Sequence, residues 1–322
     1  MTSPQSLPQT FHLILVGRSD YLIGAEHVQQ IQTLLAGQNY ALSLIVQSPL
    51  ISRWAINLNK AVSYSVLRNT RRQIERITEK VGNFDVFLAP AANLSEFKLL
   101  AMDMDSTLIN IECIDEIAAA VHKKTQVARI TADTMSGKIK DFGQSLRERV
   151  ALLKGCTLSE LEHIYNHVLK INQGGDILVK TAQTQQLKTA IVSGGFDFFA
   201  DRVATTLDVD FTVCNMLDIQ QQKVTGRLRG ELVDAEFKAL AVDRFCQRLD
   251  ATPNHVLVIG DGSNDLKMMD LSFWSVGYHA KPVVQEEVAY NIRFGGLHTT
   301  LALFQDTQTH YETYENTQLS TS

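Results

Sequence analysis

Two aspartates stand two positions apart directly after an apolar run, in the stretch LLAMDMDSTLINIE at residues 99–112. The carboxylates of Asp103 and Asp105 repel each other, and burial strengthens this repulsion because the surrounding dielectric is low. A protein that keeps both charges at such a position needs a cation close by. The rest of the chain must therefore supply or bind one.

Two later segments carry residues that meet this need. Lys238 stands in DAEFKAL, which has a helical pattern, and VLVIGDGSND at 256–265 places Asp261 and Asp265 in a glycine-flanked loop after four apolar residues. Carboxylate oxygens are hard ligands that suit octahedral Mg²⁺, which proteins often bind together with a substrate phosphate. The four aspartates and the lysine therefore predict a magnesium site that handles phosphate.

A third segment predicts a cradle for that phosphate. In IVSGG, at 191–195, apolar strand residues run into a loop of small residues. The hydroxyl of Ser193 and the backbone N–H groups of Gly194 and Gly195 are suited to phosphate oxygens, because glycine lets the backbone approach a ligand closely. Lys238 would add a point charge to the same oxygens.

Each of these segments also has a purely structural explanation. DxDxT at 103–107 suits a turn with a helix cap, SGG a tight turn, and GDGSND a β-turn with an Asx cap, while a lone helical lysine is usually solvated. All four on one chain, in the order DxDxT, SGG, Lys238 and GDGSND, each at an expected strand end or helix, favour a catalytic site instead.

The elements that position these residues follow an α/β pattern. The apolar segments LLAM, TAIV and VLVI alternate with helical stretches, which predicts a parallel sheet whose loops gather at the carboxyl ends of the strands. Residues of about 110–180 interrupt the alternation with several helical segments. This insertion after the first strand predicts a helical cap over the site.

Residues 11–90 have a different order. Apolar periodicity and turn residues predict strand, helix, two strands, helix and strand, which is the βαββαβ or ferredoxin-like plan. The order resembles the ACT family of small amino-acid-sensing and dimerising domains, in pattern and not in any diagnostic residue. We expect an ACT-like domain at 1–93, with 91–97 as a linker, a catalytic domain at 94–308 and a polar, disordered tail at 309–322.

Composition narrows the class of protein. The chain has 322 residues, of which 45% are hydrophobic and 20% charged, with a net charge of −5. This is typical of a soluble globular protein of two or three domains. Neither a membrane helix nor a signal peptide is recognisable, so we expect no membrane partner and a cytoplasmic location.

The negative charge argues against a nucleic-acid partner, and the basic run at 68–76 is typical of a solvated helix face. The four widely separated cysteines indicate buried thiols and not a zinc site.

The ordered set of motifs resembles the haloacid dehalogenase-like (HAD) hydrolase superfamily over about residues 98–300. Four runs are similar, within that superfamily, to the phosphoserine phosphatase family: MDMDSTLINIECIDEIA, DFGQSLRERVALLKG, VSGGFDFFADR and GDGSNDLKMM. The resemblance implies a Rossmann-like core with an inserted cap. It also implies Mg²⁺-dependent hydrolysis of O-phospho-L-serine to L-serine and phosphate, the last step of serine biosynthesis.

The resemblance also implies a role for each matching acid. Asp103 would be the nucleophile that forms an aspartyl-phosphate, and Asp105 would be the general acid and then the general base. Mg²⁺ would be held by the Asp103 carboxylate, the main-chain carbonyl of Asp105, and Asp261. Asp265 would act behind Lys238 and the metal, without touching the substrate.

Substrate binding would fall to a second group of residues. Ser193, Gly194 and Lys238 would hold the phosphate, with Asn264 close to the substrate. Phosphoserine also carries an ammonium and a carboxylate, which the family binds with an acid nine residues after the nucleophile and with a cap arginine. These positions correspond here to Glu112 and Arg149, with Phe142 beside them and Arg147 as a competing arginine. GKIKDF carries one residue more between Gly137 and Phe142 than the family pattern.

Two other functions fit the same residues. The first is a HAD phosphatase or phosphotransferase that acts on another small phosphomonoester, with the Glu112 and Arg149 pair as the distinguishing feature. The second is a catalytically silent amino-acid-sensing regulator, against which the intact Asp103, Asp105, Lys238 and Asp261 speak. The N-terminal domain would mediate homodimerisation, respond to serine, or do neither.

Overall fold

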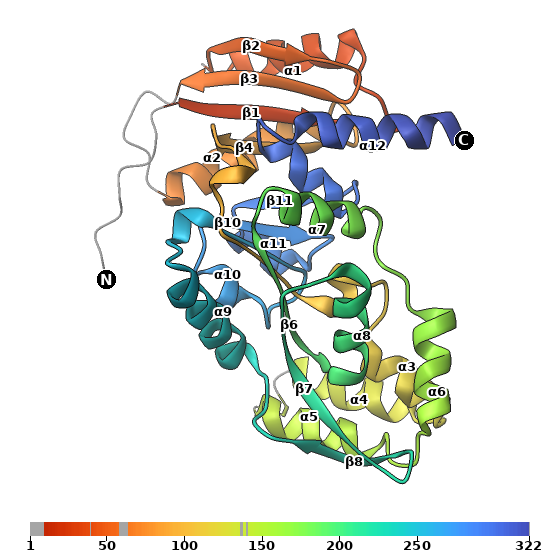
Figure 1. Ribbon diagram of the computed structural model, residues 1–322. Coiled ribbons are helices and arrows are strands. Elements are labelled where there is room, and N and C mark those ends of the chain that lie inside the picture. The colour runs from red at the N-terminus through yellow and green to blue at the C-terminus, as the bar shows by residue number, and fades with distance from the viewer. Residues whose placement is uncertain (1–9, 39, 58–63, 136–137, 140, 322) are drawn as a thin grey trace.

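The computed structural model describes residues 10–38, 40–57, 64–135, 138–139 and 141–321. The small N-terminal domain lies at one end of the molecule and the cap helices lie at the other, with the catalytic core between them (Figure 1). Gly137, where the extra residue of GKIKDF was noted, lies outside the described residues. In the described parts of the chain, no helix is both long and apolar enough to cross a membrane.

The N-terminal domain has the predicted βαββαβ order. Its strands form an antiparallel sheet in the order β2-β3-β1-β4, which is the ferredoxin-like arrangement. The elements are β1 (Thr10–Val16), α1 (Ala25–Ala36), β2 (Leu42–Gln47), β3 (Ile51–Asn57), α2 (Tyr64–Thr78) and β4 (Asp85–Pro90).

This small sheet is buried on both faces. Successive side chains of a strand point to opposite faces, so Phe11, Leu13 and Leu15 pack with α1 and α2, whereas Ile14 and Val16 join the large core of the catalytic domain. Asp85 strengthens the contact by accepting hydrogen bonds from the N–H groups of Arg293 and Gly295, both at 2.7 Å. The two domains therefore share one continuous apolar core.

The catalytic core contains the predicted parallel sheet. Its strand order is β11-β10-β9-β5-β6-β7-β8, and only β8, at one edge, runs antiparallel to its neighbour. The strands are β5 (Leu99–Met102), β6 (Lys188–Phe196), β7 (Phe211–Gln220), β8 (Lys223–Arg229), β9 (Val256–Gly260), β10 (Trp274–Tyr278) and β11 (Tyr290–Ile292).

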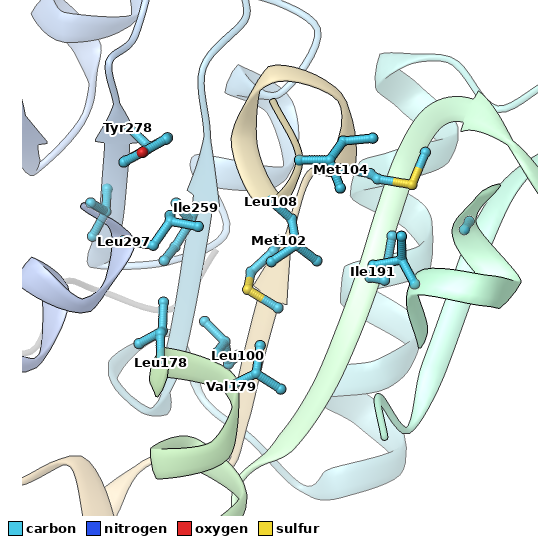
Figure 2. Close-up of a cluster of buried hydrophobic side chains, with 14 of the residues drawn as sticks. Leu100, Met102, Met104, Leu108, Leu178, Val179, Ile191, Ile259, Tyr278 and Leu297 are labelled. Carbon is cyan, nitrogen blue, oxygen red and sulfur yellow. The ribbon is translucent and has the colours of Figure 1, made fainter. Parts of the chain in front are cut away.

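Helices cover the sheet and form the cap. The cap helices are α3 (Cys113–Ala120), α4 (Lys124–Met135), α5 (Phe142–Ala151) and α6 (Leu158–His163), and the core helices are α7 (Gly175–Thr184), α8 (Asp197–Leu207), α9 (Ala235–Leu249), α10 (Leu266–Met269), α11 (Pro282–Glu287) and α12 (Gln308–Thr321). The predicted cap at about 110–180 includes most of α7. Its Leu178 and Val179 instead pack against Leu100 of β5 (Figure 2), so α7 belongs to the core.

The expected disordered tail is instead a helix. Tyr311 of α12 is fully buried and donates a hydrogen bond to the carbonyl oxygen of Gly17 in the N-terminal domain. Glu315 is also buried and lies 2.6 Å from His298. Glu315 also accepts a hydrogen bond from the N–H of Ser19, and Glu312 accepts one from the hydroxyl of Ser48. The polar composition hid these anchors, because one buried aromatic ring and a few hydrogen bonds of acidic residues hold the helix.

Two other interpretations of the sequence are corrected. The linker at 91–97 is part of the core, since Leu94 and Phe97 are buried there. The basic run on α2 is only in part a solvated face, since Arg76 is exposed but Arg71 is not. Arg71, almost fully buried, donates to the carbonyl oxygen of Gln285, and Arg68 donates to that of Glu287. Both carbonyls lie in the last turn of α11, whose final carbonyl groups lack partners within the helix.

Candidate active site

The register of two neighbouring strands places the first two acids together. β5 and β9 are adjacent and parallel, with Met102 opposite Ile259, and the N–H of Asp103 donates to the carbonyl oxygen of Ile259 at 2.9 Å. Asp103 follows β5 directly and Asp261 follows β9 directly. Both carboxylates therefore emerge at the same sheet edge, as the alternation of strands and helices predicted.

Lys238 joins two of the predicted acids. Its ammonium lies 2.8 Å from Oδ1 of Asp103 and 2.7 Å from Oδ1 of Asp265. Lys238 is 1% exposed, Asp103 4% and Asp265 0%, so all three charges are held away from water. Asp265 also accepts hydrogen bonds from the N–H groups of Asp261 and Gly262, which fixes the loop after β9.

The pKa values in this cluster reflect crowding among the acids. Burial and the charge of Asp265 raise the pKa of Asp103 far above its ordinary value, and Lys238 opposes them. Burial and Asp265 raise the pKa of Asp261 to about 6. The pKa of Lys238 is raised despite burial, because Asp103 and Asp265 stabilise its charge. One lysine thus offsets only part of the negative charge.

The carboxylates of Asp103, Asp261 and Asp265 lie close enough together to hold a metal ion. Each offers an oxygen within 4.8 Å of the others. This is a set of hard oxygen donors, which suits Mg²⁺. The incomplete charge balance around Asp103 fits a divalent cation in the same place.

The turn after β5 contributes a residue whose role the sequence did not reveal. The hydroxyl of Thr107, fully buried, donates to Oδ1 of Asp261 at 3.2 Å. Ser106, with a φ of 58°, reverses the chain, and its hydroxyl donates to Glu112 at 2.8 Å. The DxDxT spacing marked Thr107 as part of the motif but did not show which acid it would orient.

Asp105 lies in a buried environment of its own. Burial and the charge of Glu112 raise the pKa of Asp105 to about 7, although the N–H of Cys113 donates to one carboxylate oxygen at 3.2 Å. The other oxygen is buried and has no hydrogen-bond partner in the described parts of the chain. This carboxyl group is therefore poised to exchange a proton near neutral pH.

The SGG segment meets Asp105 from the neighbouring strand. A side chain on Gly195 would come within about 3.0 Å of the Asp105 carboxylate, so this position requires glycine. The N–H of Gly195 donates to the hydroxyl of Ser193 at 2.9 Å, which fixes this turn, and its contact with phosphate stays a prediction. The carbonyl oxygen of Gly194 accepts a hydrogen bond from Asn215, which also fastens the loop to Val233.

The cap residues with predicted roles in specificity are arranged as follows. Glu112 immediately precedes α3, and Arg149 lies at the end of α5. Burial lowers the pKa of Arg149, while the charges of Asp115 and Glu112 oppose this effect. Its guanidinium lies 5.9 Å from the centre of the half-exposed Phe142 ring. Arg149 is partly buried, whereas the competing Arg147 is exposed.

Two neighbours of the acidic loop complete the site. The side-chain amide of Asn264 donates to Asp265 at 3.3 Å, which places it in the predicted loop. Lys281 was not predicted. Its N–H donates to the carbonyl oxygen of Asp261 at 3.0 Å and its ammonium lies 3.6 Å from the Asp261 carboxylate. No sequence signal marks Lys281, because only the path of the chain after β10 returns it to this edge.

Comparison with known proteins agrees with this geometry. Residues 100–270 match the family described as haloacid dehalogenase-like hydrolase. A phosphoserine phosphatase of Polaromonas sp. (strain JS666) is 44% identical over 218 residues, which cover 66% of this chain and 92% of that protein. A phosphoserine phosphatase of Albidiferax ferrireducens is 45% identical over 221 residues, which cover 67% and 93%.

A solved structure extends the likeness to the N-terminal domain. The crystal structure of a probable phosphoserine phosphatase from Vibrio cholerae, in its unliganded form, has a TM-score of 0.76 and 27% sequence identity, and the match covers 97% of this chain and 91% of that one. The family match spans more than half of the chain and includes the strand ends that carry Asp103 and Asp261. The chain belongs to the haloacid dehalogenase-like hydrolase family and is similar to its phosphoserine phosphatases.

Proposed function

We propose that this protein is a Mg²⁺-dependent phosphoserine phosphatase that hydrolyses O-phospho-L-serine to L-serine and phosphate. The observation that carries the proposal is the buried lysine of the site, bound to both Asp103 and Asp265 beside Asp261. The names of the two bacterial relatives support phosphoserine as the substrate. The reaction would be the last step of serine biosynthesis and would take place in the cytoplasm.

In the first step, a carboxylate oxygen of Asp103 attacks phosphorus. The new Asp103 O–P bond forms as the bond from phosphorus to the serine oxygen breaks, which leaves an aspartyl-phosphate. Asp105 donates its proton to the departing serine oxygen. Its pKa of about 7 suits this role, since a fraction of the group is protonated at neutral pH.

In the second step, Asp105 acts as the base. Its carboxylate takes a proton from a water molecule, whose oxygen attacks phosphorus as the Asp103 O–P bond breaks. Phosphate leaves, Asp103 is regenerated, and Asp105 is protonated for the next turnover. One oxygen of Asp105 is buried without a hydrogen-bond partner among the described residues, which supports this assignment, because that oxygen can receive the proton.

Three ligands would hold Mg²⁺: the Asp103 carboxylate, the Asp105 main-chain carbonyl and Asp261. When bound, the ion neutralises charge on the phosphoryl oxygens. Thr107 would orient Asp261, and Asp265 would hold Lys238 in place. Lys238, Ser193 and Gly194 would bind the phosphate, and Asn264 would lie near the substrate.

The cap would select the amino-acid part of the substrate. Glu112 would bind the ammonium and Arg149 the carboxylate, with Phe142 packing beside the Arg149 guanidinium. The charge of Glu112 acts on the Arg149 guanidinium, which supports their placement on one side of the site. The ammonium and the carboxylate of phosphoserine call for one anion and one cation in the binding site, whereas a sugar phosphate carries neither group.

The nucleophile can be tested with Asp103→Asn. We expect near-complete loss of phosphate release from phosphoserine while the far-ultraviolet circular dichroism spectrum stays unchanged. Asp243→Asn, on the half-exposed outer part of α9, is the matched control and should retain activity. Equal rates of wild-type turnover on phosphoserine and sugar phosphates would refute the substrate assignment, and full activity of Asp103→Asn would refute the mechanism.

We also propose that the N-terminal domain mediates homodimerisation through its edge strand β2. Leu44 and Ile45 on this strand are 50% and 45% exposed, and an unpaired strand edge offers free N–H and C=O groups to a second copy. Light scattering should give the mass of a dimer for the wild type and of a monomer for Leu44→Lys/Ile45→Lys. An unchanged mass for this variant would exclude the edge as the interface.

A further inference from the structure

The outer face of α2 borders a polar cavity, which lies in the N-terminal domain and outside the active site. Its volume is about 550 Å³, within the range of small-molecule sites. The polar residues that line it are three cations and three amides: Arg72, Arg76, Lys80, Gln38, Asn69 and Gln73. Ile77 adds an apolar surface, and no carboxylate is among the lining residues.

The charges of α2 are divided between its two sides. Glu75 pairs with Arg71 at 3.2 Å, and Glu79, just beyond the helix, pairs with Arg293 of the catalytic domain. Neither Arg76 nor Lys80 forms an ion pair within the described parts of the chain. The cavity therefore concentrates positive charge on a protein whose net charge is −5.

The polar groups around the cavity are held in place. Arg72 donates to the carbonyl oxygen of Glu286, while its Nε is buried and has no partner in the described parts of the chain. The amide of Gln73 donates to Gln38 at 3.1 Å and accepts from the hydroxyl of Tyr40 at 3.4 Å. Fixed donors lose little entropy when they bind a ligand.

The spacing of the cations indicates the class of ligand. Arg72 and Arg76 are four residues apart on α2, about 6 Å along its axis, and Lys80 follows in the turn just after the helix. Three cations spread over the end of a helix and the turn after it fit a chain of phosphates better than a single phosphate, and the arginine fork matches phosphate oxygens. We propose that this cavity binds a small molecule that carries two or more phosphate groups, with Gln38, Asn69 and Ile77 contacting the rest of the ligand.

Calorimetric titration of the full chain with pyrophosphate, in EDTA and low salt, tests the site. We expect one binding event that weakens at least tenfold in Arg76→Gln/Lys80→Gln. Lys180→Gln/Arg244→Gln removes the same charge from exposed positions of the catalytic domain and should bind like the wild type. Unchanged unfolding temperatures would show that both variants fold.

Two results would overturn the inference. The first is that the Arg76→Gln/Lys80→Gln variant binds pyrophosphate no more weakly than the Lys180→Gln/Arg244→Gln variant, which includes the case in which the wild type does not bind at all. The second is tighter binding of a short single-stranded RNA than of pyrophosphate, lost in the same Arg76→Gln/Lys80→Gln variant, which would assign the surface to nucleic acid. Neither result depends on phosphoserine hydrolysis, so failure of the proposed function would leave this test intact.

Discussion

The ammonium of Lys238 lies 2.8 Å from the carboxylate of Asp103, and both side chains are almost completely removed from water. A buried charge without a partner lowers the stability of a protein, so each of these two charges offsets the free-energy cost of burying the other. The same pair positions the proposed nucleophile. This one contact therefore links the stability of the fold to the proposed reaction.

Lys238→Met is expected to lower the free energy of unfolding by about 3–5 kcal/mol, because it leaves Asp103 and Asp265 buried without their cation. Urea denaturation of the metal-free protein measures this loss. Adding Asp103→Asn to Lys238→Met should recover part of the loss, since one orphaned charge is then removed. Strictly additive losses in the double variant would contradict the coupling.

Arg149→Met is expected to lower kcat/KM for phosphoserine by about 10- to 100-fold, the effect of losing one hydrogen bond to a charged group. The rate on p-nitrophenyl phosphate, which has no carboxylate, should change little. Arg147→Met is the matched control, because Arg147 is exposed on the same helix. A larger loss for Arg147→Met would transfer the carboxylate-binding role to that residue.

Removal of divalent metal with EDTA should abolish phosphate release, and adding Mg²⁺ should raise the unfolding temperature. The rise follows because a ligand that binds only the native state stabilises it by mass action. Asp261→Asn is expected to remove most of the rise. Scanning calorimetry at several Mg²⁺ concentrations measures both effects, and an equal rise in Asp261→Asn would exclude this residue as a ligand.

The buried pair of Glu315 and His298 predicts a pH dependence of stability. Burial acts to raise the pKa of Glu315, but the hydrogen bonds from His298 and from the N–H of Ser19 outweigh it, so the pKa falls below its ordinary value of 4.5. A depressed carboxyl pKa stabilises the fold above the unfolded-state pKa, and this contribution is lost as the pH falls through the folded-state pKa.

Glu315→Gln should therefore be less stable than the wild type at pH 7, by about 1–3 kcal/mol. The difference should shrink as the pH falls below 4.5. Urea denaturation at a series of pH values provides the measurement, with Glu162→Gln, at an exposed position of α6, for comparison. A difference that stays constant down to pH 3 would show that the Glu315 charge does not contribute.

The sequence by itself determined the order of elements and the residues of the site. Period-two and period-3.6 patterns are local properties, so they marked the βαββαβ domain, the strands β5, β6 and β9, and the cap. Because parallel strands end at one sheet edge, the same patterns brought Asp103, Asp261 and Asp265 into one cluster. Resemblance to a known family added the roles that spacing alone left open.

The tertiary structure decided what depends on contacts between distant segments. Lys281 reaches Asp261, Thr107 orients it, and Arg71 binds a carbonyl at the end of α11, none of which leaves a periodic signal. The polar tail is a helix for the same reason, since Tyr311 is buried against His298 of the catalytic domain and donates to Gly17 of the N-terminal domain. Local patterns record which face of an element is apolar, whereas the partner of a buried polar group is fixed only when the chain has folded.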